Sequence, residues 1–311
     1  NQKIISRIMT ESVKKEEVKS PQVVADDKQP QAAKAKPAPQ VAWYDVVVIL
    51  LLFLISQALG GVVSTALGVR LPGEAYTTSF DADVLEAADS MQARFVAISY
   101  AISMVLCFAM LWIYRLVRGW RSLLSFRAPG WASPFRLLCG YLLMWCVSIA
   151  IEPLAAQLPG DQSGLGGGGW LLVSAVLLAP PFEEIIFRGY AAGILRRLYG
   201  GMVAWIISAL IFGLVHVIPS VALTATFSGL VLSFFYLRYR SLVIVIMLHA
   251  MNNITACFLH SVDLGDVTFR ELLGGGTLYW TIFAFCTVVS VASLVRMGKT
   301  VQGIKSDNYQ P

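Results

Sequence analysis

Long apolar stretches separated by short polar segments fill the chain from about residue 43 onward. A helix needs about 20 apolar residues to cross the hydrocarbon core of a bilayer. Helices are the expected form of every span, because lipid offers no hydrogen-bond partner to an open backbone. The pattern therefore predicts an all-α, polytopic membrane protein with about eight transmembrane helices, near residues 43–69, 94–115, 136–158, 170–195, 202–219, 221–237, 241–260 and 277–295.

The loops between these stretches alternate in charge. Basic residues follow every second stretch: Arg115, Arg118, Arg121, Arg127, Arg136, Arg196, Arg197, Arg238, Arg240, Arg296, Lys299 and Lys305. Acidic residues dominate two of the opposite loops: Glu74, Asp81, Asp83, Glu86, Asp89, Asp263, Asp266 and Glu271. Because short cytoplasmic loops are enriched in Lys and Arg, this alternation predicts eight crossings with both termini in the cytoplasm. The alternative is one long bent helix across Pro219-Ser220, which would leave seven spans.

Composition separates a membrane domain from two tails. Residues 1–40 are rich in Lys, Glu, Gln, Pro and Ala and have little apolar surface to bury, which predicts a disordered cytoplasmic tail. Residues 41–299 form the predicted eight-helix domain, and 300–311 a second cytoplasmic tail. The printed sequence opens on Asn1, and Met9 is a candidate natural start.

The overall composition agrees with lipid as the main solvent. The chain is 57% hydrophobic and 14% charged, whereas soluble domains have about 25% charged residues. The net charge of +5 does not indicate a nucleic-acid partner, since Lys and Arg lie between the apolar stretches. The five cysteines lie inside apolar stretches without a CxxC pair and are expected to be packing residues.

Ionisable residues stand inside three of the predicted spans: Glu183, Glu184 and Arg188 in the fourth, His216 in the fifth and His249 in the seventh. A charged residue at the centre of a membrane helix costs about 2.5–3.5 kcal/mol on insertion scales, and such residues usually serve a function. They must therefore find partners inside the bundle.

Helical spacing suggests which partners. Glu184 and Arg188 are i,i+4 and lie about 40° apart around a helix, so they are expected to pair. Glu183 points about 100° away from Glu184, which leaves it free to act as a general base. His249 and Asn253 share one face of the seventh span, with Asn252 rotated off it.

Two further features surround these residues. Phe212 and His216 share a face of the fifth span by the same spacing. Pro180-Pro181 precedes the carboxylates, removes two backbone donors and is expected to kink the helix and free carbonyl groups there. His260, at the outer end of the seventh span, is expected to lie at the membrane interface.

Each feature also has an ordinary structural interpretation. A Glu–Arg pair at i,i+4 is often a solvated bridge, and a single His or Asn in a membrane helix often bonds a neighbouring helix. Their joint occurrence on the fourth, fifth and seventh apolar stretches favours a shared functional site.

These residues resemble the motifs of a known family. Glu183-Glu184-Ile-Ile-Phe-Arg188-Gly189 fits the EExxxR motif of the CPBP family, the CAAX proteases and bacteriocin-processing enzymes, also called the Abi family. Phe212-Gly-Leu-Val-His216 resembles its FxxxH motif, and His249-Ala-Met-Asn-Asn253 its HxxxN motif. The similarity covers about residues 170–260 and implies an intramembrane endopeptidase core there. The substrate would be a membrane-tethered, in some members prenylated, protein or peptide.

The resemblance also implies roles for the residues. Glu183 would be the general base that activates water with His216, while His249 and Asn253 would stabilise the oxyanion. Glu184 and Arg188 would support the site. A metal is the open alternative: Glu183, His216 and His249 could hold zinc with one position free, although HExxH is lacking and the ligands would come from separate helices. Otherwise no cofactor is required.

Two other functions are compatible with the same residues. One is a non-catalytic membrane scaffold or a bacteriocin-immunity-type binding protein, because a fold does not determine a function. The other is a proton-coupled transporter with a Glu–His relay, which the lack of an internal repeat disfavours. For the peptidase, we expect the substrate to approach from the cytoplasmic side.

Overall fold

The computed structural model describes residues 41–73, 81–120, 124–126, 134–160, 166–265 and 267–306. The predicted tail at 1–40 and the end of the predicted second tail lie outside these residues. Within them the regular secondary structure is helical, with one isolated bridge between Phe126 and Ser241, and turns and loops join the helices.

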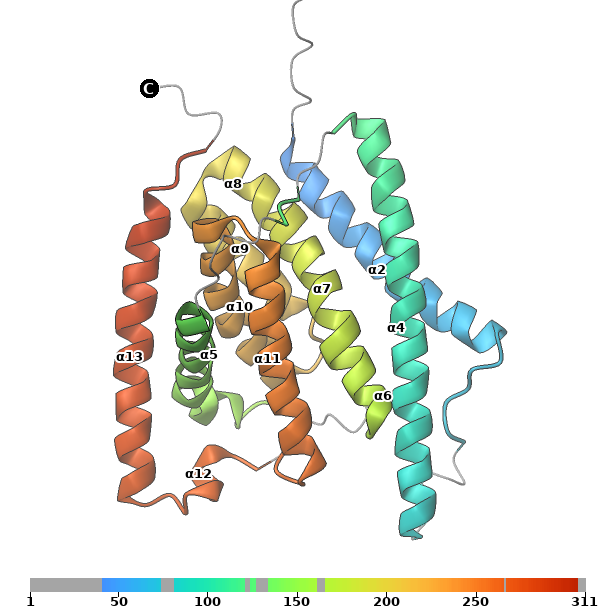
Figure 1. Cartoon of the computed structure of the whole chain (residues 1–311), viewed down its shortest axis with the longest axis vertical. Coiled ribbons are helices and arrows are strands. Elements are labelled where there is room, and N and C mark those ends of the chain that lie inside the picture. The colour runs from blue at the N-terminus through green and yellow to red at the C-terminus, as the bar shows by residue number, and fades with distance from the viewer. Residues whose placement is uncertain are drawn as a thin grey trace, which may run out of the picture. The chain divides into compact units, whose positions relative to one another are not determined.

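The predicted all-α membrane fold is confirmed (Figure 1). Seven described helices are long and apolar enough to cross a membrane, and α9 is a shorter apolar helix of 14 residues. The helices are α2 (Trp43–Ala66), α4 (Ala82–Arg118), α5 (Pro134–Ala155), the composite helix Gly169–Tyr199, α9 (Gly201–Leu214), α10 (Pro219–Tyr239), α11 (Leu242–Ser261) and α13 (Thr277–Gln302), with a short α12 (Phe269–Leu272) before the last.

The composite helix changes its winding along its length. It comprises α6 (Gly169–Leu172), the π-helical η2 (Val173–Leu178), α7 (Ala179–Glu184), the π-helical η3 (Ile185–Ala192) and α8 (Gly193–Tyr199). π-helical turns join residues i and i+5 and are frequent at functional sites. The turns on both sides of α7 are therefore wider than the regular α-helix on which the predicted side-chain angles were based.

Helices α9 and α10 form an antiparallel hairpin. Trp205 Nε1 donates to the Leu230 carbonyl (2.7 Å), and the hydroxyls of Ser208 and Ser233 lie 2.9 Å apart. This pairing shows that the alternative of one bent helix is wrong. Helix α9 also ends at Leu214, so the prediction that the span runs to residue 219 is wrong, and His216 lies in the turn between the two helices.

Helix α4 is longer than predicted. It begins at Ala82, twelve residues before the predicted residue 94, and its N-cap Asp81 accepts a hydrogen bond from the Asp83 amide. Hydropathy cannot detect these polar first turns, because their stability comes from capping and helix propensity rather than from lipid.

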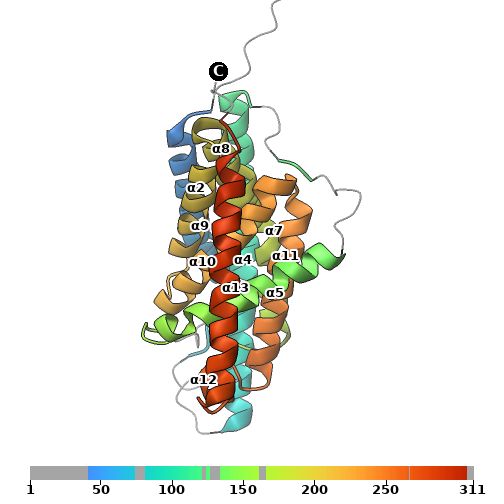
Figure 2. The ribbon, with the colours of Figure 1, turned by 90° about the vertical axis from the view of Figure 1, so that its left-hand side faces the viewer.

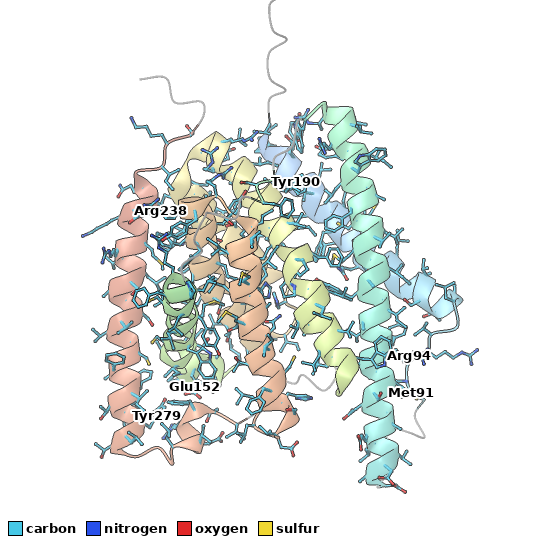
Figure 3. The ribbon with its side chains drawn as sticks, viewed as in Figure 1. Met91, Arg94, Glu152, Tyr190, Arg238 and Tyr279 are labelled. Atoms are coloured by element: carbon cyan, nitrogen blue, oxygen red, sulfur yellow. The ribbon has the colours of Figure 1, made fainter. Side chains whose placement is uncertain are left out.

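Backbone hydrogen bonds join helix ends to neighbouring segments at both ends of the bundle. The Gly201 amide at the start of α9 donates to the Ile304 carbonyl (2.8 Å), and the Ser220 amide at the start of α10 donates to the Pro159 carbonyl (3.1 Å). We call one end of the helices the basic end, because it carries Arg118, Arg196, Arg197, Arg238, Arg240, Arg296 and Lys299. We call the other end the acidic end, because it carries Asp81, Asp83, Glu86, Asp89, Glu152, Asp263 and Glu271. Figure 2 shows the same helices from the side, and Figure 3 places Arg238 and Glu152 at opposite ends.

We predict that Gly213→Ala destabilises the α9–α10 hairpin by about 1–3 kcal/mol, the usual cost of overpacking. A Cβ there would overlap the Thr226 hydroxyl and lie 2.6 Å from the Ala222 carbonyl oxygen. The measurement is the thermal midpoint in detergent. Gly61→Ala is the control, because a Cβ at that helical glycine meets nothing within 4 Å; equal midpoints for both variants would contradict the prediction.

Candidate functional site

The prolines leave one backbone carbonyl without its helical partner. The Ala179 amide closes an i→i−5 turn on the Ser174 carbonyl. The next residue, Pro180, has no N–H to continue this pattern to Ala175. The Asn253 side chain supplies the missing donor, since its Nδ2 donates to the Ala175 carbonyl (2.7 Å). The expectation that the prolines free a carbonyl is met here, and Asn253 links α11 to the composite helix.

Glu184 and Arg188 form the predicted ion pair. Arg188 Nη1 donates to Glu184 Oε1 (2.9 Å), and both side chains are fully buried. Arg188 also approaches the Gly229 carbonyl (3.4 Å) and lies over the Phe212 ring, 4.1 Å from its centroid. The pair is therefore enclosed by α9 and α10 rather than solvated at an interface.

His249 lies between the two glutamates. Its Nδ1 is 2.9 Å from Glu184 Oε1, and its Nε2 is 3.9 Å from Glu183 Oε2. Because the Arg188-paired carboxylate can only accept, Nδ1 carries the proton in this hydrogen bond. In the neutral imidazole, Nε2 is then an acceptor that faces Glu183, at a distance too long for a direct hydrogen bond.

The two carboxylate oxygens of Glu183 differ in their hydrogen bonding. Tyr100 Oη, from α4, donates to Glu183 Oε1 (2.8 Å). Within the described residues, Oε2 is buried without a hydrogen-bond partner, and the side chain as a whole is 13% exposed. The two neighbouring carboxylates thus have different surroundings, as the sequence predicts.

His216 approaches the site from the α9–α10 turn. Its Nδ1 donates to the Phe212 carbonyl (2.8 Å), which leaves Nε2 as the acceptor nitrogen. The Phe212 ring lies against both imidazoles, with centroids 5.0 Å from His216 and 5.6 Å from His249. Within the described residues no hydrogen bond joins His216 to Glu183, so the carboxylate's nearer imidazole is that of His249.

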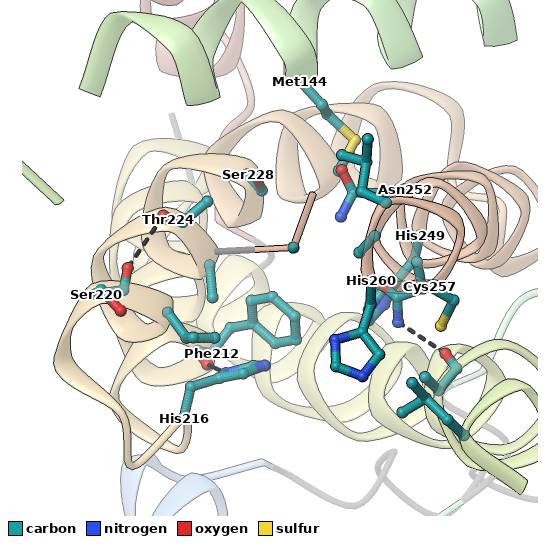
Figure 4. A pocket seen from close by; sticks show the side chains of 18 of the residues that line it. Met144, Phe212, His216, Ser220, Thr224, Ser228, His249, Asn252, Cys257 and His260 are labelled. Carbon is teal, nitrogen blue, oxygen red and sulfur yellow. Dashed lines mark hydrogen bonds between the residues drawn. The ribbon is translucent and has the colours of Figure 1, made fainter. Parts of the chain in front are cut away.

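A cavity of about 650 Å³ extends from these imidazoles. One wall carries hydroxyls along α10, from Ser220, Thr224 and Ser228 (Figure 4). The opposite wall, along α11, carries His249, Asn252, Asn253 and His260, and Leu171, Ala175, Leu232 and Met144 supply apolar surface. Glu183 does not line the cavity directly; its Oε2 faces His249, which does.

Two residues of the site were not predicted from the sequence: Asn252, which lines the cavity, and Tyr100, which bonds Glu183. Asn252 was expected to point away from the site, yet it lines the cavity beside Asn253. Tyr100 is the only partner that α4 gives to the carboxylates among the described residues, and it lies 83 positions from Glu183 in sequence. A polar aromatic side chain within the second apolar stretch was its one visible signal.

The described residues do not form a three-ligand metal site. They contain no group of three or more His, Cys, Asp or Glu side chains that could hold a metal ion. Glu183 Oε2 and His249 Nε2 lie 3.9 Å apart, but the described residues place no third His, Cys, Asp or Glu with them in a group that could hold a metal ion. The arrangement therefore does not fit the zinc set Glu183, His216 and His249, and no step below involves a metal.

Fold and site together define a polytopic α-helical membrane protein with a carboxylate–imidazole cluster buried among its helices. Residues 166–255 match the family described as Type II CAAX prenyl endopeptidase Rce1-like, and the chain carries a domain of this family over those residues. The matched segment contains all six residues singled out from the sequence: Glu183, Glu184, Arg188, His216, His249 and Asn253. No curated protein and no solved structure matches the chain.

We predict that removing one member of the buried pair, by Glu184→Gln or Arg188→Met, destabilises the fold by about 3–5 kcal/mol, because an uncompensated charge stays buried. The double variant Glu184→Gln/Arg188→Met should recover part of this loss. Thermal midpoints of the three variants in detergent test the point. Additive losses in the double variant would show that the two charges do not compensate each other.

Proposed function

We propose that the chain is an intramembrane endopeptidase of the CAAX-protease type, which hydrolyses a peptide bond in a membrane-tethered protein or peptide. The observation that carries the proposal is the Oε2 of Glu183, which has no hydrogen-bond partner among the described residues and lies 3.9 Å from Nε2 of His249, beside a cavity with polar walls. A buried carboxylate and an imidazole at this spacing can hold and polarise a water molecule. The match of residues 166–255 to an endopeptidase family supports this chemistry.

In the proposed reaction, Glu183 accepts a proton as the water oxygen attacks the carbonyl carbon of the scissile bond. His249, held through Nδ1 by Glu184, accepts a hydrogen bond from the same water at Nε2. The proton on Glu183 then passes to the amide nitrogen as the C–N bond breaks, so that the products are a carboxylic acid and an amine.

Asn253 is the proposed donor to the oxyanion. Its amide nitrogen has two hydrogens, of which one bonds the Ala175 carbonyl and the other is available to the cavity. His216, on the facing side of the Phe212 ring, is a second candidate donor once protonated. A single oxyanion donor is typically worth about 10²–10³ in turnover. In this assignment His249 acts with Glu183 on the water, and His216 is a donor to the oxyanion. The motifs imply the reverse, with His216 beside Glu183 and His249 at the oxyanion.

A non-catalytic scaffold is the main alternative, and the same cavity could bind a partner segment without cleaving it. The two functions differ in what the carboxylate must do. A scaffold tolerates neutralisation of Glu183, because within the described part of the chain the carboxylate accepts one hydrogen bond, from Tyr100, which a neutral amide can also accept.

We predict that Glu183→Gln abolishes cleavage of a transmembrane or CAAX-type reporter by the purified full chain, because a neutral amide cannot accept the proton from water. The thermal midpoint should stay near that of the wild type, since Gln keeps the bond from Tyr100. Glu86→Gln, a change at an exposed carboxylate of α4, is the matched control. Full cleavage by Glu183→Gln would favour the scaffold.

The same assay is run with a chelator, which is expected to leave the rate unchanged because the described donors do not form a three-ligand set. A loss that added zinc restores would overturn the metal-independent mechanism and leave the peptidase function intact.

We also predict that Tyr100→Phe lowers kcat by about tenfold with little change in KM. The Tyr100 hydroxyl bonds Glu183 and is not among the residues that line the cavity, and a bond to a charged group is worth about 1.5–3 kcal/mol. Tyr141→Phe is the control, because its hydroxyl bonds Thr255 between two helices and does not touch a carboxylate. Equal effects of the two changes, or a change confined to KM, would contradict a positioning role for Tyr100.

A further inference from the structure

The cavity extends toward only one end of the bundle. Its outer lining residues are Asp89 near the start of α4, Gly166 just before α6, Ser220 at the start of α10, His260 in the last turn of α11 and Gly265 beyond it. All of these lie toward the acidic end. The cavity therefore leads from the imidazoles to the end that carries Asp83 and Glu152.

Toward the basic end, packed side chains close the bundle. The lining residues nearest that end are Leu232, seven positions before the end of α10 at Tyr239, and His249, seven positions after the start of α11 at Leu242. Seven residues span about 10 Å of helix. Fully buried side chains, including Tyr236 and Leu242, fill this interval.

The charges indicate which side of the membrane each end faces. Short cytoplasmic loops are enriched in Lys and Arg, and the described helices place Arg196, Arg197, Arg238 and Arg240 at the closed end. By this rule the closed end lies in the cytoplasm and the open end outside it. The expected approach of the substrate from the cytoplasm therefore conflicts with the direction of the cavity.

We propose that the site is reached from the non-cytoplasmic side and takes an extended segment of a membrane-tethered polypeptide that lies on that side; this rests on the proposed peptidase function. The hydroxyls of Ser220, Thr224 and Ser228 recur every four residues along α10, from the mouth of the cavity to its depth. Opposite them, Asn252 and Asn253 add amide groups. A peptide unwound within a membrane needs such partners for its backbone.

The direct test is cysteine accessibility in the full chain. The more exposed native cysteines, Cys139 and Cys146, are replaced by Ala, and the cavity is probed by His260→Cys at its mouth and Thr224→Cys within it. Arg238→Cys, at an exposed position of the basic end, is the matched control. A membrane-impermeant maleimide is added to intact cells and, in parallel, to permeabilised cells.

We expect both cavity positions to be labelled in intact cells and Arg238→Cys only after permeabilisation. Labelling of the cavity positions only after permeabilisation, or in neither condition, would overturn the proposed direction of access. The background without an added cysteine gives the reactivity of the three remaining native thiols. These outcomes do not depend on catalysis.

A pair of reporters connects access with cleavage. Both carry the same cleavable segment next to one transmembrane helix, on the non-cytoplasmic side in the first and on the cytoplasmic side in the second. Cleavage of the first alone supports the proposal, and cleavage of the second alone overturns it while leaving the peptidase function in place. Failure to cleave either reporter counts against the peptidase function itself.

Discussion

The buried pair of Glu184 and Arg188 is the interaction on which the central helices depend. Neither side chain has any exposed surface, and each charge alone would cost several kcal/mol within a membrane. The pair is stable only because neighbouring helices complete its surroundings: Phe212 from α9, the Gly229 carbonyl from α10 and His249 from α11. The three helices that follow the composite helix are thus arranged around one ion pair.

This arrangement explains why two adjacent glutamates can differ so strongly. Arg188 balances the charge of Glu184, so Glu184 can also accept a hydrogen bond from Nδ1 of His249 without being an isolated charge. Fixing Nδ1 also fixes the direction of Nε2, which then faces Glu183. Among the described residues, Glu183 accepts a hydrogen bond from the Tyr100 hydroxyl and keeps its other oxygen without a hydrogen-bond partner. The structural role of one carboxylate therefore creates the setting in which the other is free for chemistry.

Local relations within a helix could be predicted from the sequence, whereas relations between helices could not. The Glu184–Arg188 contact follows from i,i+4 spacing and survives the change to π-helical winding at Ile185. The pairing of Glu183 with Tyr100 depends on how α4 packs against the composite helix, and no periodicity encodes that. The short length of α9 was also hidden, because the apolar residues continue past Leu214 while the backbone turns.

The carbonyl freed by the proline and the polar residue opposite it belong to one arrangement. A carbonyl without a donor is costly in lipid, so the proline that deprives Ala175 of its helical donor requires a replacement from elsewhere. Asn253 provides it, and an apolar side chain at that position would leave the carbonyl unpaired. An amide is suited to this place because it has two hydrogens, one for the backbone and one for the cavity. The interrupted backbone pairing before the carboxylates is therefore tolerable only because the residue that faces it is polar. In this way the backbone geometry of the composite helix selects the chemistry of the wall across from it.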